Sequence, residues 1–138
     1  IDFDLYHPRV QEYFPISKEK GMNGILLEKE SIEESIQKTH INELDVLSLG
    51  NTKEPIKGFS TEEIQELINT MEKVYDYIII DTGDLLSNAH SILLTSLVDT
   101  TVLVIADNQT SIKDVSQLKD VLELIHPKIA GFIFNKAR

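Results

Sequence analysis

Carboxylate side chains follow two apolar segments of this sequence. Asp81 comes directly after the apolar run Tyr77–Ile80. Asp2 and Asp4 alternate with apolar residues at the start of the chain. A continuous apolar run is typical of a buried parallel strand, and parallel sheets bind their ligands at the carboxyl ends of the strands. Carboxylate oxygens suit Mg²⁺, so these positions predict a magnesium and phosphate site where the strand ends converge.

A third apolar run, 129–134, ends in Asn135 and Lys136 and could bring polar groups to the same edge. A simpler interpretation stays open for each acidic position. Asp81 would then cap the helix that follows it, and Asp2 and Asp4 would be solvent-facing residues after a strand.

Apolar patterning predicts strands that alternate with helices. Ser31 and Ser60 each precede a Glu by three residues, which is the capping-box signal for the start of a helix. Alternating strands and helices predict an α/β fold with a mainly parallel sheet, in one domain over residues 1–138. Strands are expected at 1–5, 44–49, 77–81, 101–106 and 129–134, and helices at 10–14, 31–38, 60–75, 88–97 and 111–125, with a polar loop at 50–58. The apolar stripes of two of these helices, Ile64–Tyr75 and Ile112–Ile125, are expected to be core.

Composition excludes several classes of function. The chain has 138 residues, 41% of them hydrophobic, and a net charge of -10, which argues against a nucleic-acid surface or docking on anionic lipid. It has no Cys, so disulfides and Cys-containing zinc sites are excluded. No apolar run approaches the roughly 20 residues that a membrane helix needs, so no direct membrane insertion is expected. Because IDFD at Ile1 reads as the end of a strand already under way, we expect a fragment.

The order of the segments resembles the bacterial tyrosine kinases of polysaccharide export, a family of deviant-Walker P-loop ATPases. The Walker A′ segment of that family is similar to IDFDLYHPRVQEYF, and its Walker B strand is similar to YDYIIIDTGD. Its intervening helices and strand resemble GMNGILLEKESIEESIQKT and ELDVLSLG, and its last two strands resemble LVDTTVLVIADNQTS and IAGFIFNKA. The resemblance covers almost the whole chain. It implies a three-layer α/β/α fold that is P-loop NTPase-like but incomplete.

The resemblance also implies roles for individual residues. Asp2 and Asp4 correspond to the Walker A′ carboxylates, which in the family orient Mg²⁺ and help activate the acceptor tyrosine hydroxyl. Asp81 corresponds to the Walker B carboxylate, which holds a Mg²⁺-bound water. Asn135 matches a position near the adenine base. We therefore expect Asp2 and Asp4 to be catalytic, Asp4 and Asp81 to bind the metal, and Asp81 and Asn135 to contact ATP.

The sequence departs from the family pattern in three ways. It contains no Gly-rich P-loop with its Lys, a segment that lies upstream of Walker A′ in the family. Tyr6 and His7 stand where the family usually has Arg or Lys, and Gly83 with Asp84 replaces the Pro expected after Asp-Thr. These departures leave open a non-catalytic module that serves as an assembly or regulatory partner.

Two other classes share parts of the acidic pattern. Asp81-Thr82-Gly83 matches the signature of aspartic proteases, but their chemistry needs two such aspartates and the chain has one copy. A phosphoreceiver domain also has an early acidic pair, a strand-ending Asp and a late Lys, but Asp4 and Asp81 are too far apart in the sequence for it. We rank both below the kinase resemblance.

By that resemblance, the intact protein is a cytoplasmic tyrosine-kinase-like ATPase of capsular or exopolysaccharide biosynthesis that uses Mg²⁺ and ATP. Its expected partner is a membrane-embedded regulator of polysaccharide chain length, or a second copy of itself. Without the P-loop, the 138 residues alone are expected to be inactive. The strand Tyr77–Asp81 should then present an unprotected apolar edge.

Overall fold

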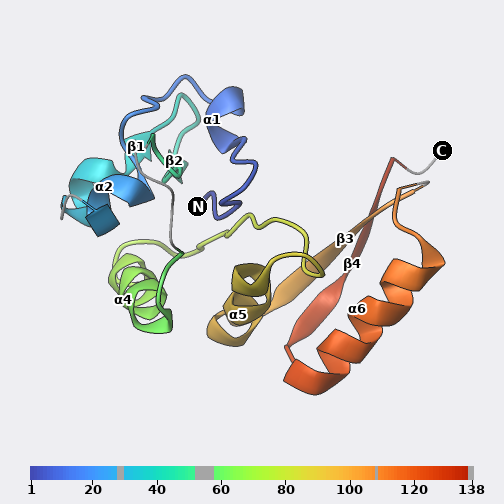
Figure 1. Cartoon of the computed structure of the whole chain (residues 1–138). Helices are drawn as coiled ribbons and strands as arrows, with labels where there is room; N and C mark the ends of the chain where they lie inside the picture. Colours follow the sequence, from blue (N-terminus) through green and yellow to red (C-terminus); the bar gives the residue numbers. More distant parts are fainter. Residues whose placement is uncertain (28–29, 52–57, 108, 137–138) are drawn as a thin grey trace. The chain divides into compact units, whose positions relative to one another are not determined.

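A computed structural model describes residues 1–27, 30–51, 58–107 and 109–136. The chain forms two compact units, Ile1–Gly83 and Asp84–Arg138 (Figure 1). The expectation of a single domain over residues 1–138 stays a prediction. In the described residues, no helix has both the length and the apolar character needed to cross a membrane.

The first unit is built around the N-terminal residues of the chain. The Asp2 amide donates to the Leu47 carbonyl at 2.9 Å, and the Phe3 amide donates to the Asp81 carbonyl at 2.7 Å. Asp2 and Asp81 form a parallel bridge. Because successive residues of an extended chain direct their backbone groups to opposite sides, residues 1–3 lie between the segments around Leu47 and Asp81.

Short helices and one hairpin complete the first unit. Helix α3 ends at Ser35 rather than at Lys38 as expected, because the next residue, Ile36, is extended. Gln37 and Lys38 instead form β1, which pairs antiparallel with β2. The elements are α1 (Val10–Tyr13), α2 (Met22–Leu27), α3 (Ile32–Ser35), β1 (Gln37–Lys38), β2 (Asp45–Val46) and α4 (Thr61–Met71). Most of the polar loop expected at 50–58 falls on residues 52–57, outside the described residues.

Helix α4 covers the core of the first unit. The predicted capping box is confirmed, because Ser60 accepts a bond from the Glu63 amide and Glu63 accepts one from the Ser60 amide. Its buried residues are Ile64, Ile68 and Met71, as the helical spacing predicts. The ring of Phe3, which is 2% exposed, packs edge-on against Phe59 with the ring centroids 5.0 Å apart. This packing fixes the segment that carries Asp2.

The second unit contains α5 (Ala89–Leu97), β3 (Thr101–Ala106), α6 (Ile112–Ile125) and β4 (Ile129–Asn135). Strands β3 and β4 are parallel, as predicted, with Thr101 opposite Ile129 and Ala106 opposite Asn135. The intervening helix α6 lies beside the two strands (Figure 1). Its start at Ser111 is a second full capping box. These elements form a βαβ unit.

Several segments expected to be buried are exposed. Residues 77–80 form no strand ladder, and the Tyr77 and Ile79 side chains are 89% and 80% exposed. The stripe on α6 is not core, since none of its residues is buried. Burial of a parallel strand needs neighbours on both edges and both faces, and in the described residues β3 and β4 pair only with each other. Other exposed residues are Val102, Val104, Ile112, Leu124, Phe132, Ile133 and Phe134.

Candidate functional site

The structure brings the two acidic strand ends of the first unit together. Asp2 and Asp81 are partners in the parallel bridge, with the Asp81 amide 2.9 Å from the Ile1 carbonyl. The N-terminal amine of Ile1 donates to the Ile79 carbonyl at 2.7 Å. Sequence reasoning predicted that these strand ends converge, and the pairing places their backbones side by side.

Asp2 is fully buried, with 0% of its surface exposed. Its Oδ1 accepts a hydrogen bond from the Asp4 amide at 3.2 Å, and its Oδ2 accepts one from the Val10 amide at 3.0 Å. Burial raises the pKa of the Asp2 carboxyl, and the negative charges of Asp81 and Asp4 add to the rise. The two backbone bonds act in the opposite direction, because they stabilise the ionised form. Both side-chain oxygens of Asp2 thus accept hydrogen bonds from backbone amides of its own chain.

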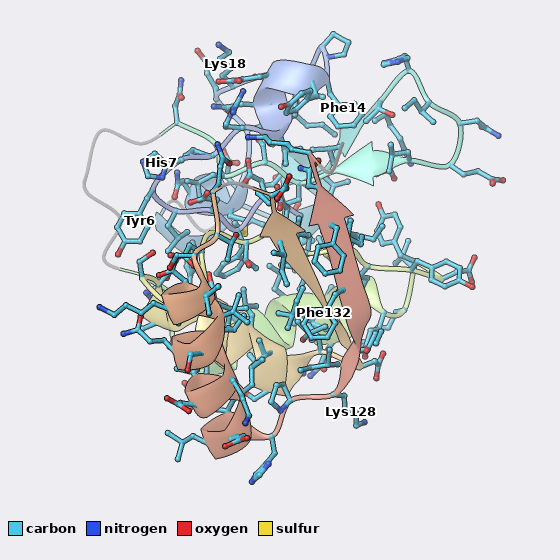
Figure 2. The ribbon with its side chains drawn as sticks, turned by 90° about the vertical axis from the view of Figure 1, so that its right-hand side faces the viewer. Tyr6, His7, Phe14, Lys18, Lys128 and Phe132 are labelled. Carbon is cyan, nitrogen blue, oxygen red and sulfur yellow. The ribbon has the colours of Figure 1, made fainter. Side chains whose placement is uncertain are left out.

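Asp4 is partly exposed and organises the loop that follows it. Its Oδ1 accepts bonds from the amides of Tyr6 at 3.2 Å and His7 at 3.0 Å. Figure 2 shows the Tyr6 and His7 side chains projecting from this loop. The same carboxylate lies against Gly83, where an added Cβ would be 3.0 Å from Oδ1 and 3.3 Å from Cγ. Asp4 thus meets the turn that follows Asp81.

Asp81 is exposed, and Thr82 after it donates its hydroxyl to the Gly83 carbonyl at 3.1 Å. The donor set of Asp4 and Asp81 is all oxygen, which fits a hard cation that keeps its own waters. Among the described residues, no three His, Cys, Asp or Glu side chains are arranged to hold a metal directly. The sequence contains no Gly-rich loop to cradle phosphates.

Asn135 belongs to the second unit, so its expected proximity to the carboxylates stays a prediction. It ends β4, and its carbonyl accepts a bond from the Asp107 amide at 2.9 Å. Its side-chain oxygen accepts from the Lys136 amide at 2.9 Å. The Lys136 ammonium donates to Gln109 at 2.9 Å. These bonds join the ends of β3 and β4.

Sequence reasoning missed three partners of the site. The Val10 amide donates a hydrogen bond to Asp2 from eight residues away. Gly83 has no side chain and so leaves room for the Asp4 carboxylate. Leu47 anchors Asp2 through its carbonyl. Val10 and Leu47 act through backbone atoms, so their residue types could not have indicated these contacts. Only Gly83 left a signal, as the departure from the expected Pro.

The comparisons with known proteins identify the family. A family model described as an AAA domain matches residues 10–133. The tyrosine-protein kinase YwqD of Bacillus subtilis is 32% identical over 136 residues, which are 98% of this chain and 57% of YwqD. The chain belongs to the AAA domain family. The relatives that it resembles are named as bacterial tyrosine-protein kinases.

Other relatives agree with this assignment. The putative tyrosine-protein kinase CapB of Staphylococcus aureus is 26% identical over 99% of this chain and 60% of its own length. The VpsO kinase domain superposes with a TM-score of 0.84 at 28% identity, over 99% of this chain and 68% of that one. The chimerical protein CapA2B2, at 23% identity, has the same fold with a TM-score of 0.84, over 99% of this chain and 61% of its own. The expected kinase resemblance and the α/β, P-loop NTPase-like fold class are thereby confirmed.

The chain spans between half and two thirds of the curated relatives YwqD and CapB, with 57% and 60% covered. It spans a smaller share, 19%, of the tyrosine-protein kinase ptk of Acinetobacter johnsonii. The relatives therefore contain segments with no counterpart in these 138 residues.

Proposed function

We propose that the chain is the Walker A′ and Walker B part of a cytoplasmic tyrosine-kinase-like ATPase of capsular or exopolysaccharide biosynthesis. The observation that carries the proposal is the parallel pairing of Asp2 with Asp81, which joins the two acidic strand ends in a chain of this family. The proposed partner is a membrane-embedded regulator of polysaccharide chain length, or a second copy of the kinase.

In this proposal Asp4 and Asp81 hold Mg²⁺ through its waters, and Asn135 lies beside the adenine of ATP. When bound, Mg²⁺-ATP supplies the phosphoryl group and neutralises its charge. Asp4 contributes a carboxylate whose Oδ1 is fixed by two amides, so its orientation is set before a ligand arrives. Asp81 contributes an exposed carboxylate at the end of the paired segment. The predicted place of Asp2 near the incoming tyrosine hydroxyl stays a prediction.

A second function, a non-catalytic assembly or regulatory module, is favoured by one observation. Gly83 and Asp84 replace the Pro that the family resemblance predicts. A degenerate member with this change would keep the fold and its surfaces without transferring phosphate.

The two functions are separated by measuring ATP binding and phosphate transfer to tyrosine with the complete protein that contains this sequence. In the kinase, ATP binding depends on Mg²⁺, and the variants Asp4→Asn and Asp81→Asn each lower kcat by about 100-fold. The matched control is Asp76→Asn, which removes another exposed carboxylate of the first unit and should leave kcat unchanged.

Two outcomes would contradict this proposal. Absence of ATP binding by a complete protein that does carry a GK[ST] loop rejects the kinase function and supports the module. Equal losses for Asp76→Asn and Asp81→Asn would show that the effect is one of net charge rather than of the proposed metal position.

A further inference from the structure

The Asp2 carboxylate has no exposed surface in the first unit. Its two oxygens face the backbone amides of Asp4 at 3.2 Å and Val10 at 3.0 Å. A group that contacts a substrate or a hydrated metal ion needs an accessible oxygen. In this geometry Asp2 offers its oxygens to its own chain instead.

The two bonds made by Asp2 hold both ends of one loop. Asp4 starts the loop and Val10 ends it as the first residue of α1. Between them, Oδ1 of Asp4 accepts the amides of Tyr6 and His7. Two carboxylates therefore organise residues 4–10 through hydrogen bonds to backbone amides. Asp2 binds the two ends of the loop, and Asp4 binds its middle.

Asp2 is itself held on a rigid support. Its amide donates to Leu47, and the next residue, Phe3, is bonded to Asp81 and packed against Phe59. The position of Asp2 is therefore defined by buried neighbours, and a buried, hydrogen-bonded carboxylate transmits that position to the loop.

The loop in turn sets where the Asp4 carboxylate lies. Its Oδ1 and Cγ approach Gly83 so closely that an added Cβ would be 3.0 and 3.3 Å away. This contact joins Asp4 to the turn that follows Asp81. Movement of the loop by even a few tenths of an ångström would change the separation between the Asp4 carboxylate and that turn.

We propose that Asp2 is a positioning residue, in place of the catalytic role that the family resemblance implies. It clamps the loop 4–10 so that the Asp4 carboxylate meets the turn after Asp81, and it touches neither metal nor substrate. The metal part of this statement rests on the proposed function. The clamp itself does not rest on the proposed function, because it consists of the hydrogen bonds from the Asp4 and Val10 amides to Asp2.

The test uses the 138-residue chain, Mn²⁺ as the probe ion and NMR as the readout, since carboxylate sites that bind Mg²⁺ also accept Mn²⁺. The variant Asp2→Asn keeps the shape of the side chain but turns an NH₂ group toward one of the two amides. We expect about tenfold faster hydrogen exchange at the Asp4 or Val10 amide and about tenfold weaker Mn²⁺ binding, the usual effect of an outer-shell change. Asp4→Asn should abolish Mn²⁺ binding while the Val10 amide stays protected.

Asp45→Asn is the matched control for a merely structural loss. Asp45 is another largely enclosed carboxylate of the first unit, with a side chain that is 9% exposed and accepts two hydrogen bonds. Its replacement should lower stability and leave both the Mn²⁺ affinity and the Val10 amide unchanged.

The wild-type chain gives an independent readout that does not depend on the folding of a variant. Bound Mn²⁺ should broaden the side-chain carboxyl carbons of Asp4 and Asp81 more than that of Asp2. Equal or greater broadening of Asp2 would overturn the proposal, because it would place Asp2 on the metal.

Two results with the variants would also overturn it. The first is an Asp2→Asn chain with wild-type exchange at both amides, which would mean that there is no clamp. The second is loss of Mn²⁺ binding as complete as in Asp4→Asn with both amides still protected. If the wild-type chain binds no Mn²⁺, the metal part of the proposed function fails, and amide exchange alone decides the clamp.

Discussion

At the scale of single residues, Gly83 and Asp4 depend on each other. The Asp4 carboxylate lies so close to position 83 that an added Cβ would be 3.0 Å from its Oδ1, a contact that requires a shift of a few tenths of an ångström. Two backbone amides hold its Oδ1 there, so the carboxylate has little freedom to move aside. The family resemblance predicts Pro at this position. The position of the Asp4 carboxylate therefore explains why this chain has a glycine at position 83.

Replacing Gly83 with Ala should destabilise the first unit by about 1 kcal/mol, the lower end of the usual cost of overpacking. The same replacement in an Asp4→Ala background should cost much less, because the conflicting carboxylate is gone. A double-mutant cycle from urea unfolding measures the difference. Equal costs in the two backgrounds would show that the contact with Asp4 does not restrict position 83.

A second residue-scale feature is a pair of hydrogen bonds on one carboxylate oxygen. Oδ2 of Asp45 accepts from the Lys38 ammonium at 2.6 Å and from the Tyr75 hydroxyl at 2.7 Å. The bond from Lys38, together with that from Tyr75, lowers the pKa of Asp45, although burial acts against it. Burial and the bond to Asp45 raise the pKa of Tyr75 from 10.0 to about 12. The bonds tie the segment after α4 to the hairpin β1–β2.

This network predicts a loss of stability at alkaline pH. Because the folded pKa of Tyr75 lies above its ordinary value, its contribution is fully present below pH 10.0 and is lost as the pH rises toward about 12. We expect the loss to be about 1 kcal/mol, reduced from the full linkage value by solvent around the partly exposed ring. Free energies of unfolding between pH 9 and pH 12 measure it.

The matched variant is Tyr75→Phe, which keeps the ring and removes the hydroxyl. Its stability should fall less between pH 10 and pH 12 than that of the wild-type chain, because the hydroxyl whose pKa is raised on folding is gone. Identical pH profiles for the two chains would mean that Tyr75 ionisation is not linked to folding.

At the scale of elements, local signals in the sequence were enough to place the helices that begin at capping boxes. The predicted box of Ser60 with Glu63 forms in full, whereas at Ser31 only the bond from the Glu34 amide to the Ser31 hydroxyl forms. Strand β3 also begins and ends where its apolar run does. The end of α3 was missed because the pairing of Gln37–Lys38 with β2 overrides a weak helical pattern.

The burial of elements was harder to predict, because it depends on neighbours distant in the sequence. An apolar run indicates that a strand is suited to a covered sheet, but it does not say what covers it. Tyr77 and Ile79 fit such a strand, and they are nonetheless 89% and 80% exposed. The same limit applies to the site: the sequence predicted that Asp2 and Asp81 approach, but not that Asp2 is enclosed by the amides of Asp4 and Val10.

At the scale of the whole molecule, the exposed segment 77–80 predicts self-association. Ile79 and Asp81 turn their backbone groups toward residues 1–3, so Ile78 and Ile80 turn theirs to the opposite edge. In the described part of the chain, the amides of Ile78 and Ile80 have no hydrogen-bond acceptor. An open edge flanked by apolar side chains is a template for pairing with another strand. We expect a second copy of the chain to occupy it.

The variant Ile79→Lys should therefore shift the chain toward monomer, because a charge at an exposed edge opposes strand pairing. The matched control is Ile112→Lys, which places the same charge on α6 at a side chain that is 91% exposed. Sedimentation velocity over a concentration series gives the association constant of each chain. Since both variants change the net charge equally, a decrease confined to Ile79→Lys assigns the association to the edge. A wild-type chain that stays monomeric at high concentration, or equal decreases in both variants, would contradict the prediction.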